Sequence, residues 1–112
     1  MNDCIFCKII KGDIPSDKVY EDGNFIVIRD ISPAYKKHLL IITKKHIASV
    51  NDVTENDGEL FSSIFSVAKT VAENENFAGT GYRLTVNCGK DAGQLVPHFH
   101  MHILAGEPLR NL

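Results

Sequence analysis

Residues 97–104 read Pro97-His98-Phe99-His100-Met101-His102-Ile103-Leu104, a run in which histidines alternate strictly with apolar side chains. Successive side chains of an extended strand point to opposite faces, so the three histidines are predicted to share one face, roughly 7 Å apart at about 3.3 Å per residue. Phe99, Met101 and Ile103 share the other face and are predicted to bury in a core. Imidazole exchanges protons near neutral pH and ligates metals. The run therefore predicts both a core strand and a reactive site.

The bulk composition predicts a single domain, residues 1–112. The chain has 112 residues, of which 44% are hydrophobic and 23% charged, enough for one core and too few for two domains. The formal net charge of -2 argues against a protein that binds nucleic-acid phosphates. No apolar run approaches the ~20 residues that cross a bilayer, and no signal segment opens the chain. We expect a cytoplasmic protein with no nucleic-acid partner and no membrane span.

The remaining pattern predicts an α+β fold. Residues 4–11 are predicted to form a short helix that Gly12 ends, and residues 54–77 one long helix with Thr54 as its N-cap and an apolar stripe at helical spacing. Apolar runs predict five strands, at residues 18–22, 25–30, 38–43, 82–87 and 98–104. This order favours a five-stranded antiparallel sheet packed on the long helix. A sheet edge of this kind is often buried in a homodimer, which the sequence permits.

A glycine-rich loop, residues 87–97, leads directly into the histidine strand. It contains Asn87, Gly89, Lys90, Gly93 and Gln94. Glycines allow a backbone to turn its N–H groups toward an anion. Phosphoryl or nucleotidyl transfer requires such donors beside a nucleophile, because the nonbridging phosphate oxygens must be stabilised. The composition of the loop is also compatible with a loop that only connects two strands. Its position directly before the histidine strand favours an anion site.

Cys4 and Cys7 form a C-x-x-C pair, and Cys88 stands alone. An odd number of cysteines argues against a disulfide scaffold, and the place of the pair at the start of the chain argues against a thioredoxin-like redox site. Two interpretations stay open: half of a metal site, or two buried thiols. With two histidines the pair would form a tetrahedral zinc site, which is structural because no position is left for water.

Two further histidines flank the third predicted strand. His38 opens it, and His46 follows Lys44-Lys45 beyond its end. Each is compatible with an ordinary surface histidine. Antiparallel pairing of strands would bring both toward the histidine run.

Together these segments resemble the histidine triad (HIT) family. The run His98–Leu104 is similar to the family signature H-φ-H-φ-H-φ-φ, in which φ is apolar. The similarity covers about residues 4–106 and includes Cys4–Ile9, Ile14-Pro15, Asp30–Pro33, His38–Ile42, Lys44–His46, Gly81–Arg83, Asn87 and Gly93-Gln94. The Hint branch of the family, the nucleoside phosphoramidate hydrolases, is the most similar.

The resemblance implies a homodimeric enzyme that hydrolyses purine nucleoside 5'-phosphoramidates through a covalent nucleotidyl-histidine. It implies that His100 attacks the α-phosphorus and that water then releases the nucleoside monophosphate. His102 is implied to contact the phosphate and to help protonate the leaving amine, while His98 and His38 orient His100. Two-step displacement suits imidazole, and an amine leaves readily only when it is protonated.

The same resemblance implies the groups that bind the nucleotide. Asn87 and the backbone of Gly93, Gln94 and Leu95 would hold the phosphate, and Asp30 would accept the ribose hydroxyls. The base would occupy an apolar slot formed by Phe6, Ile9, Ile14, Ile28 and Ile31.

Some bacterial-type members that open with C-x-x-C contain structural zinc. The ligands that this resemblance implies are Cys4, Cys7, His46 and His98, and the chemistry itself is expected to need no cofactor.

The sequence departs from the pattern of the Hint branch at two places that concern selectivity for the leaving group. Leu95 replaces a polar residue that is frequent in the Hint branch, and the tail after Gly106 lacks the aromatic extension of some members.

Other functions stay open at this point. A dinucleoside polyphosphate hydrolase of the same family would prefer a polyphosphate, and a nucleotidyltransferase is less favoured because such members have glutamine at the position of His102. A metal site built from the histidine run, as in cupin-like barrels, conflicts with the helix predicted at residues 54–77. A non-catalytic nucleotide-binding or interaction protein would bind AMP or GMP without turnover.

Overall fold

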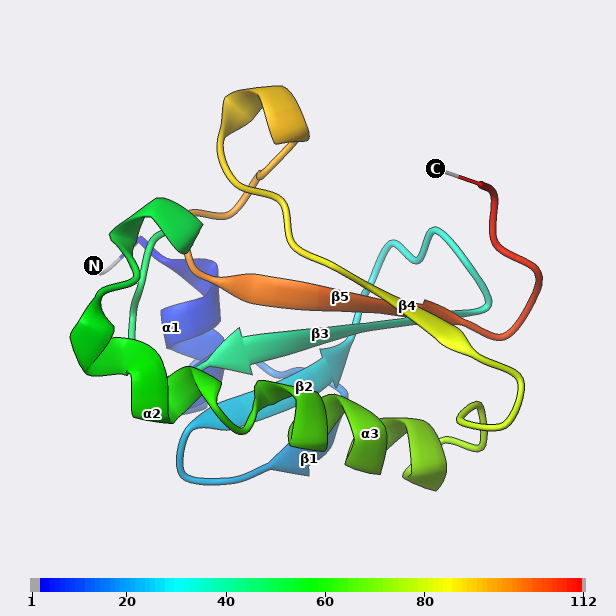
Figure 1. The fold of residues 1–112 in the computed structure, drawn as a ribbon. Coiled ribbons are helices and arrows are strands. Elements are labelled where there is room, and N and C mark those ends of the chain that lie inside the picture. Colours follow the sequence, from blue (N-terminus) through cyan, green and yellow to red (C-terminus); the bar gives the residue numbers. More distant parts are fainter. Residues whose placement is uncertain (1–2, 112) are drawn as a thin grey trace.

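A computed structural model describes residues 3–111, and its elements follow the predicted order. The helix α1 (Ile5–Lys11) is followed by the strands β1 (Lys18–Glu21), β2 (Phe25–Arg29) and β3 (Lys37–Thr43). The helices α2 (Gly58–Phe61) and α3 (Ile64–Asn74) precede the strands β4 (Tyr82–Thr85) and β5 (His100–Ala105). The strands form one antiparallel sheet in the order β1-β2-β3-β5-β4 (Figure 1). The predicted α+β fold with a five-stranded antiparallel sheet is confirmed.

The sheet has helices on both faces (Figure 1). One face packs on α3, through a core that contains Val27, Ile41, Met101 and Ile103 of the strands and Val67 and Val71 of the helix. The other face packs on α1, through a cluster that contains Phe6, Ile26, Leu40 and Ile42. Because side chains alternate along a strand, His100 and His102 lie on the α1 face while Met101 lies on the α3 face.

The long helix predicted over residues 54–77 is interrupted. Thr54 is an N-cap, as predicted, but it caps a 3-10 turn at Glu55–Asp57. A turn that begins at Ser62 separates α2 from α3. The Ser62 hydroxyl donates to the backbone oxygen of Glu59 at 2.7 Å, and such a bond competes with the regular helical backbone. In the described part of the chain, no helix is long and apolar enough to cross a membrane.

The last strand begins two residues later than predicted. The alternation placed His98 in this strand, but β5 starts at His100. The N–H of His98 donates to the oxygen of Val96 at 2.8 Å, and the N–H of Phe99 donates to the oxygen of Ile47 at 2.6 Å. These bonds hold His98 in a turn outside the sheet. The evenly spaced row of three histidines on one strand is therefore wrong, and only two of them belong to β5.

Candidate active site

Two histidines from neighbouring strands form a hydrogen-bonded pair on the α1 face. His38 Nε2 lies 2.9 Å from His102 Nδ1. His38 Nδ1 accepts the Ala34 N–H at 3.0 Å, so a neutral His38 has its proton on Nε2. His38 therefore donates to His102 Nδ1, and His102 has its own proton on Nε2. This Nε2 atom is buried and has no hydrogen-bond partner among residues 3–111.

Burial keeps both members of this pair neutral at pH 7. Desolvation, together with His100 and His38, lowers the pKa of His102 to about 4, and the carboxylate of Asp30 opposes this shift. Desolvation also lowers the pKa of His38, again against Asp30, whose Oδ2 lies 3.4 Å from His38 Nε2. Leaving a buried donor unpaired costs about 1–3 kcal/mol. A ligand that accepts the His102 N–H would recover that free energy.

His100 presents the complementary nitrogen. Its Nδ1 donates to the backbone oxygen of His98 at 2.7 Å, so the lone pair of the neutral ring is on Nε2. The ring is only 9% exposed and packs edge-on against Phe6, with centroids 5.1 Å apart. The centroid of the His102 ring is also 5.1 Å away. The arrangement places a nucleophilic nitrogen beside a neutral N–H donor.

The two histidines expected to orient His100 act differently in the structure. His98 contacts His100 through its backbone oxygen. The side chain of His38 contacts His102 instead. The backbone of His98 thus contacts His100, whereas the hydrogen bond of His38 fixes the tautomer of His102. That the two histidines orient His100 stays a prediction.

The predicted metal ligands come together beside the start of α1. The ligand atoms of Cys4, Cys7, His46 and His98 all lie within 4.8 Å of one another. Cys4 Sγ is 3.2 Å from His98 Nδ1, Cys7 Sγ is 3.2 Å from His46 Nδ1, and the two Nδ1 atoms are 3.1 Å apart. His98 Nε2 donates to the backbone oxygen of Thr43 at 2.7 Å. The lone pair of the neutral His98 ring is therefore on Nδ1, which faces the cluster.

These separations fit a tetrahedral zinc ion. With Zn–S about 2.3 Å and Zn–N about 2.0–2.1 Å, tetrahedral angles place two nitrogens roughly 3.3 Å apart and a sulfur and a nitrogen roughly 3.5 Å apart. The structure has 3.1 Å between the nitrogens and 3.2 to 3.6 Å for three of the four sulfur–nitrogen pairs. Burial and the neighbouring Cys4 raise the pKa of the Cys7 thiol. The thiol therefore keeps its proton unless a cation is bound.

A second group of possible metal ligands consists of Asp30, His38 and His102, whose ligand atoms also lie within 4.8 Å of one another. The hydrogen bonds argue against a metal here. A neutral imidazole has one lone pair, and the Ala34 N–H already uses the one on His38. The Nε2 of His38 that faces the group is protonated and cannot ligate. We interpret this group as a hydrogen-bonded chain.

The glycine-rich loop is folded by its own hydrogen bonds. Gly89 and Gly93 have φ angles of 86° and 80°, values that favour glycine. The N–H of Gly93 donates to Lys90, and the N–H of Gln94 donates to Gly89. In the described chain the Leu95 amide has no hydrogen-bond partner. Of the three amides expected to hold a phosphate, only that of Leu95 lacks a hydrogen-bond partner among residues 3–111.

The structure brings together part of the predicted nucleotide site. Phe6 and Ile28 are buried in the cluster beneath α1, and Ile9 packs against that cluster. Ile14 is not a member of it, and Ile31 is 97% exposed. Three of the five residues thus share one cluster, and the base slot stays a prediction.

The polar residues predicted to bind the nucleotide lie near the histidine pair. Asp30 directly follows β2 and faces His38. Asn87 lies two residues beyond Thr85, the residue of β4 that pairs with His102. Both side chains therefore follow strands that border the site.

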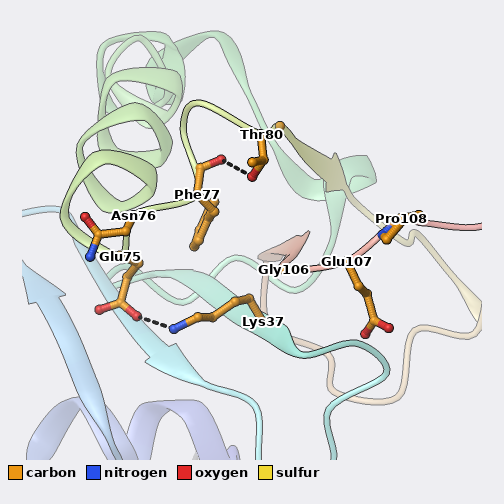
Figure 2. A pocket seen from close by; sticks show the side chains of 9 residues that line it. Lys37, Glu75, Asn76, Phe77, Thr80, Gly106, Glu107 and Pro108 are labelled. Carbon is orange, nitrogen blue, oxygen red and sulfur yellow. Dashed lines mark hydrogen bonds and ion pairs between the residues drawn. The ribbon is translucent and has the colours of Figure 1, made fainter.

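A separate cavity is lined by none of the five histidines. It has a volume of about 490 Å³. Figure 2 shows its lining, which includes Lys37, Glu75, Asn76, Phe77, Thr80 and Glu107. Glu75 is already paired with Arg29 at 2.8 Å and with Lys37 at 3.5 Å. The charge of Glu75 is thus matched by two cations, and no histidine lines the cavity, so we assign the site to the histidines.

Three backbone groups that contact the site histidines are not among the predicted site residues. They are the Ala34 N–H and the backbone oxygens of Thr43 and His98, which fix the tautomers of three histidines. Backbone groups have no signature in residue type. Only the path of the chain around β3 and β5 could have indicated them.

Comparison with known proteins agrees with this geometry. A family model described as "Scavenger mRNA decapping enzyme C-term binding" matches residues 3–108. The purine nucleoside phosphoramidase of Escherichia coli is 46% identical over 105 residues, which are 94% of this chain and 88% of that protein. A histidine triad protein from Clostridium difficile has a TM-score of 0.96 and 44% identity, covering 100% of this chain and 97% of that one. A HIT family hydrolase from Legionella pneumophila has a TM-score of 0.93 and 46% identity, covering 96% of each chain. With its histidine signature and this degree of similarity, the chain belongs to the histidine triad family.

Proposed function

We propose that the protein hydrolyses purine nucleoside 5'-phosphoramidates through a covalent nucleotidyl-histidine. The observation that carries the proposal is a pair of complementary imidazoles. His100 Nε2 has a lone pair, and the buried Nε2 of His102 has an N–H without a partner among the described residues. A phosphate group satisfies both, because its phosphorus accepts the nucleophile and its oxygen accepts the N–H. The name of the relative from Escherichia coli, purine nucleoside phosphoramidase, supports the substrate class.

The first half-reaction forms the bond between His100 Nε2 and the α-phosphorus and breaks the bond between phosphorus and nitrogen. The backbone oxygen of His98 accepts the Nδ1–H and stabilises the positive charge that the ring gains. The neutral N–H of His102 donates to a phosphate oxygen. The amine takes up one proton from solvent as it leaves.

The second half-reaction transfers the nucleotidyl group to water. Water attacks the phosphorus and loses one proton, and His100 leaves as a neutral imidazole. The proton taken up in the first half is thereby returned, and the products are a nucleoside monophosphate and an amine. Imidazole is a good nucleophile and a good leaving group at neutral pH, which is why two steps replace one difficult displacement.

The nucleotide would be held by groups around the two histidines. Asn87 and the Leu95 amide would bind the phosphate, and the Asp30 carboxylate would accept the ribose hydroxyls. The half-buried Ile9 and the exposed Ile31 would contact the base. These roles rest on the resemblance and on the position of each residue beside the site.

The cluster of Cys4, Cys7, His46 and His98 would hold zinc as a structural ion. Four protein donors fill a tetrahedral ion, so the metal would supply cross-linking and not a bound water. The two functions of His98 use different atoms: its ring nitrogen faces the cluster, and its backbone oxygen orients His100. Zinc binding and orientation of the nucleophile are therefore compatible.

We also propose that the protein is a homodimer. The sheet order leaves β1 and β4 as edges, and every residue of β4 is only half-buried. Pairing of β4 with a second copy would satisfy its free backbone groups. Light scattering coupled to gel filtration should give twice the mass of the chain; a monomer at micromolar concentration would contradict this assembly.

Comparison of the turnover of two substrates tests the proposed function. Adenosine 5'-phosphoramidate and diadenosine polyphosphate are offered separately to the purified protein and to a His100→Ala variant. We expect the parent to prefer the phosphoramidate and the variant to lose turnover by at least 10³-fold. A preference for the polyphosphate would replace the substrate class. Tight AMP binding without turnover of either substrate would overturn the proposal in favour of a binding protein.

A further inference from the structure

The side chain of Gln94 is almost fully engaged in hydrogen bonds. Its Oε1 accepts the Gly89 N–H at 3.0 Å. Its Nε2 donates to the oxygens of Ala48 and Val96, at 2.8 and 3.0 Å. A side-chain amide has two N–H donors, and Gln94 uses both. It has no donor left for a phosphate, so a direct contact between this side chain and the nucleotide does not fit.

These bonds connect the two ends of the glycine-rich loop. Gly89 lies near its start, and Val96 lies near its end. Between them Gly89 and Gly93 have φ angles in the left-handed region, where glycine costs little but is also conformationally free. The backbone bonds of Gly93 and Gln94 close the turn locally. The Gln94 side chain adds the bond that fixes the Val96 end, next to the free Leu95 amide.

The same side chain connects the loop to a backbone segment that also holds the histidine run. Ala48 accepts from Gln94, and its neighbour Ile47 accepts the Phe99 N–H at 2.6 Å. The glycine-rich loop and Phe99, the residue before His100, are therefore bonded to the adjacent carbonyl groups of Ala48 and Ile47. Gln94 thus connects the loop that contains Leu95 to the segment that also holds Phe99.

We propose that Gln94 is a positioning residue for the reaction: it does not touch the substrate, and it holds the Leu95 amide at the phosphate that His100 attacks. This inference rests on the proposed function, because it assigns the phosphate to that amide. A displacement of about 1 Å in a group that positions substrate can reduce turnover on the order of 10²-fold. Loss of the three bonds should therefore act on phosphate binding and not on the base.

The test uses Gln94→Met, which keeps the length of the side chain and removes all three hydrogen bonds. Asp91→Asn is the matched control, because Asp91 is exposed in the same loop. Affinities for AMP and for adenosine are measured by calorimetry, kcat and KM are measured with adenosine 5'-phosphoramidate, and the melting temperature is recorded for each variant. Adenosine lacks the phosphate, so its affinity reports on the base and ribose subsites alone.

We expect Gln94→Met to bind AMP at least tenfold more weakly, to bind adenosine as the parent does, and to lose 10- to 100-fold in kcat/KM. The control should match the parent in all of these. Parent-like AMP affinity and turnover in Gln94→Met would overturn the inference, and so would an equal loss for AMP and adenosine, which indicates general structural damage. A parent that does not hydrolyse the phosphoramidate would overturn the proposed function instead, and the two affinities would still decide whether Gln94 positions the loop around a phosphate.

Discussion

The backbone oxygen of His98 accepts a hydrogen bond from Nδ1 of His100 at 2.7 Å. The ring of His98 points the other way, with Nδ1 3.2 Å from the sulfur of Cys4. One residue thus connects the predicted metal cluster to the predicted nucleophile through two different atoms. The cluster should influence the reaction through the position of a backbone carbonyl, without a metal ion at the phosphate.

Zinc should bind once per chain and should stabilise the fold more than it changes catalysis. A Cys7→Ser variant should lose the metal, melt at a lower temperature, and retain turnover within about tenfold, because the Thr43 and His100 bonds of His98 remain. Elemental analysis and calorimetric unfolding measure both effects. Cys88→Ser is the control, since Cys88 lies outside the cluster, and it should keep the metal. A parent that binds no zinc after purification and dialysis in zinc would contradict the assignment.

The hydrogen bond from His38 to His102 should matter for the tautomer of His102. His38→Ala removes the donor, so the His102 proton is free to move to Nδ1, and kcat/KM should fall by about 10- to 100-fold. His38→Gln restores an N–H donor at a similar distance and should recover part of the loss. Equal activity of the alanine and glutamine variants would show that the donor does not control the reaction.

Stability should depend on pH through His102. Burial and the neighbouring His100 and His38 lower the pKa of His102 from its ordinary value of 6.5 to about 4 in the folded chain. The carboxylate of Asp30 opposes this shift. Between these values the unfolded chain binds more protons than the folded one, so stability falls as the pH is lowered from about 6.5 toward 4. The loss from this group is on the order of 3 kcal/mol.

Denaturant unfolding of the parent and of His102→Gln checks this dependence. The variant lacks the titrating group, so its free energy of unfolding should fall less steeply between pH 6.5 and 4. Identical slopes for the two proteins would contradict the assignment. Turnover should also fall as the pH is lowered. A protonated His102 has a proton on Nδ1, which then cannot accept the hydrogen bond from His38.

Gly106 should be sensitive to replacement. Its φ is +92°, and a Cβ there would lie 2.9 Å from Lys37 Cγ at the start of β3. Gly106→Ala should therefore lower the free energy of unfolding by about 1–3 kcal/mol. Gly79→Ala is the matched control, since a Cβ at Gly79 meets nothing within 4 Å. Chemical denaturation measures both, and a loss below about 0.5 kcal/mol for Gly106→Ala would contradict the steric argument.

The strands were predictable because each alternates or is continuously apolar. The run at residues 97–104 also indicated correctly that Phe99, Met101 and Ile103 join one core. The interruption at Ser62 was not predictable from the apolar stripe, since the stripe continues across it. A serine hydroxyl that bonds to the preceding turn changes the backbone without changing the hydrophobic pattern.

The residue types of the site were predictable, and their connections were not. Alternation put His98 on the strand, whereas backbone bonds of His98 and Phe99 to Val96 and Ile47 keep it outside. The tautomers depend on the Ala34 N–H and the Thr43 oxygen. These are backbone groups whose positions follow from the fold and not from residue identity.

The most direct test of the account is the identity of the nucleotidylated residue. A single turnover of adenosine 5'-phosphoramidate is quenched rapidly, the protein is digested, and the peptide that contains residues 98–102 is sequenced by mass spectrometry. We predict a mass gain of one AMP on His100. This adduct should form and decay at rates consistent with turnover and should be absent in His100→Ala. An adduct on another residue, or undiminished turnover by His100→Ala, would contradict it.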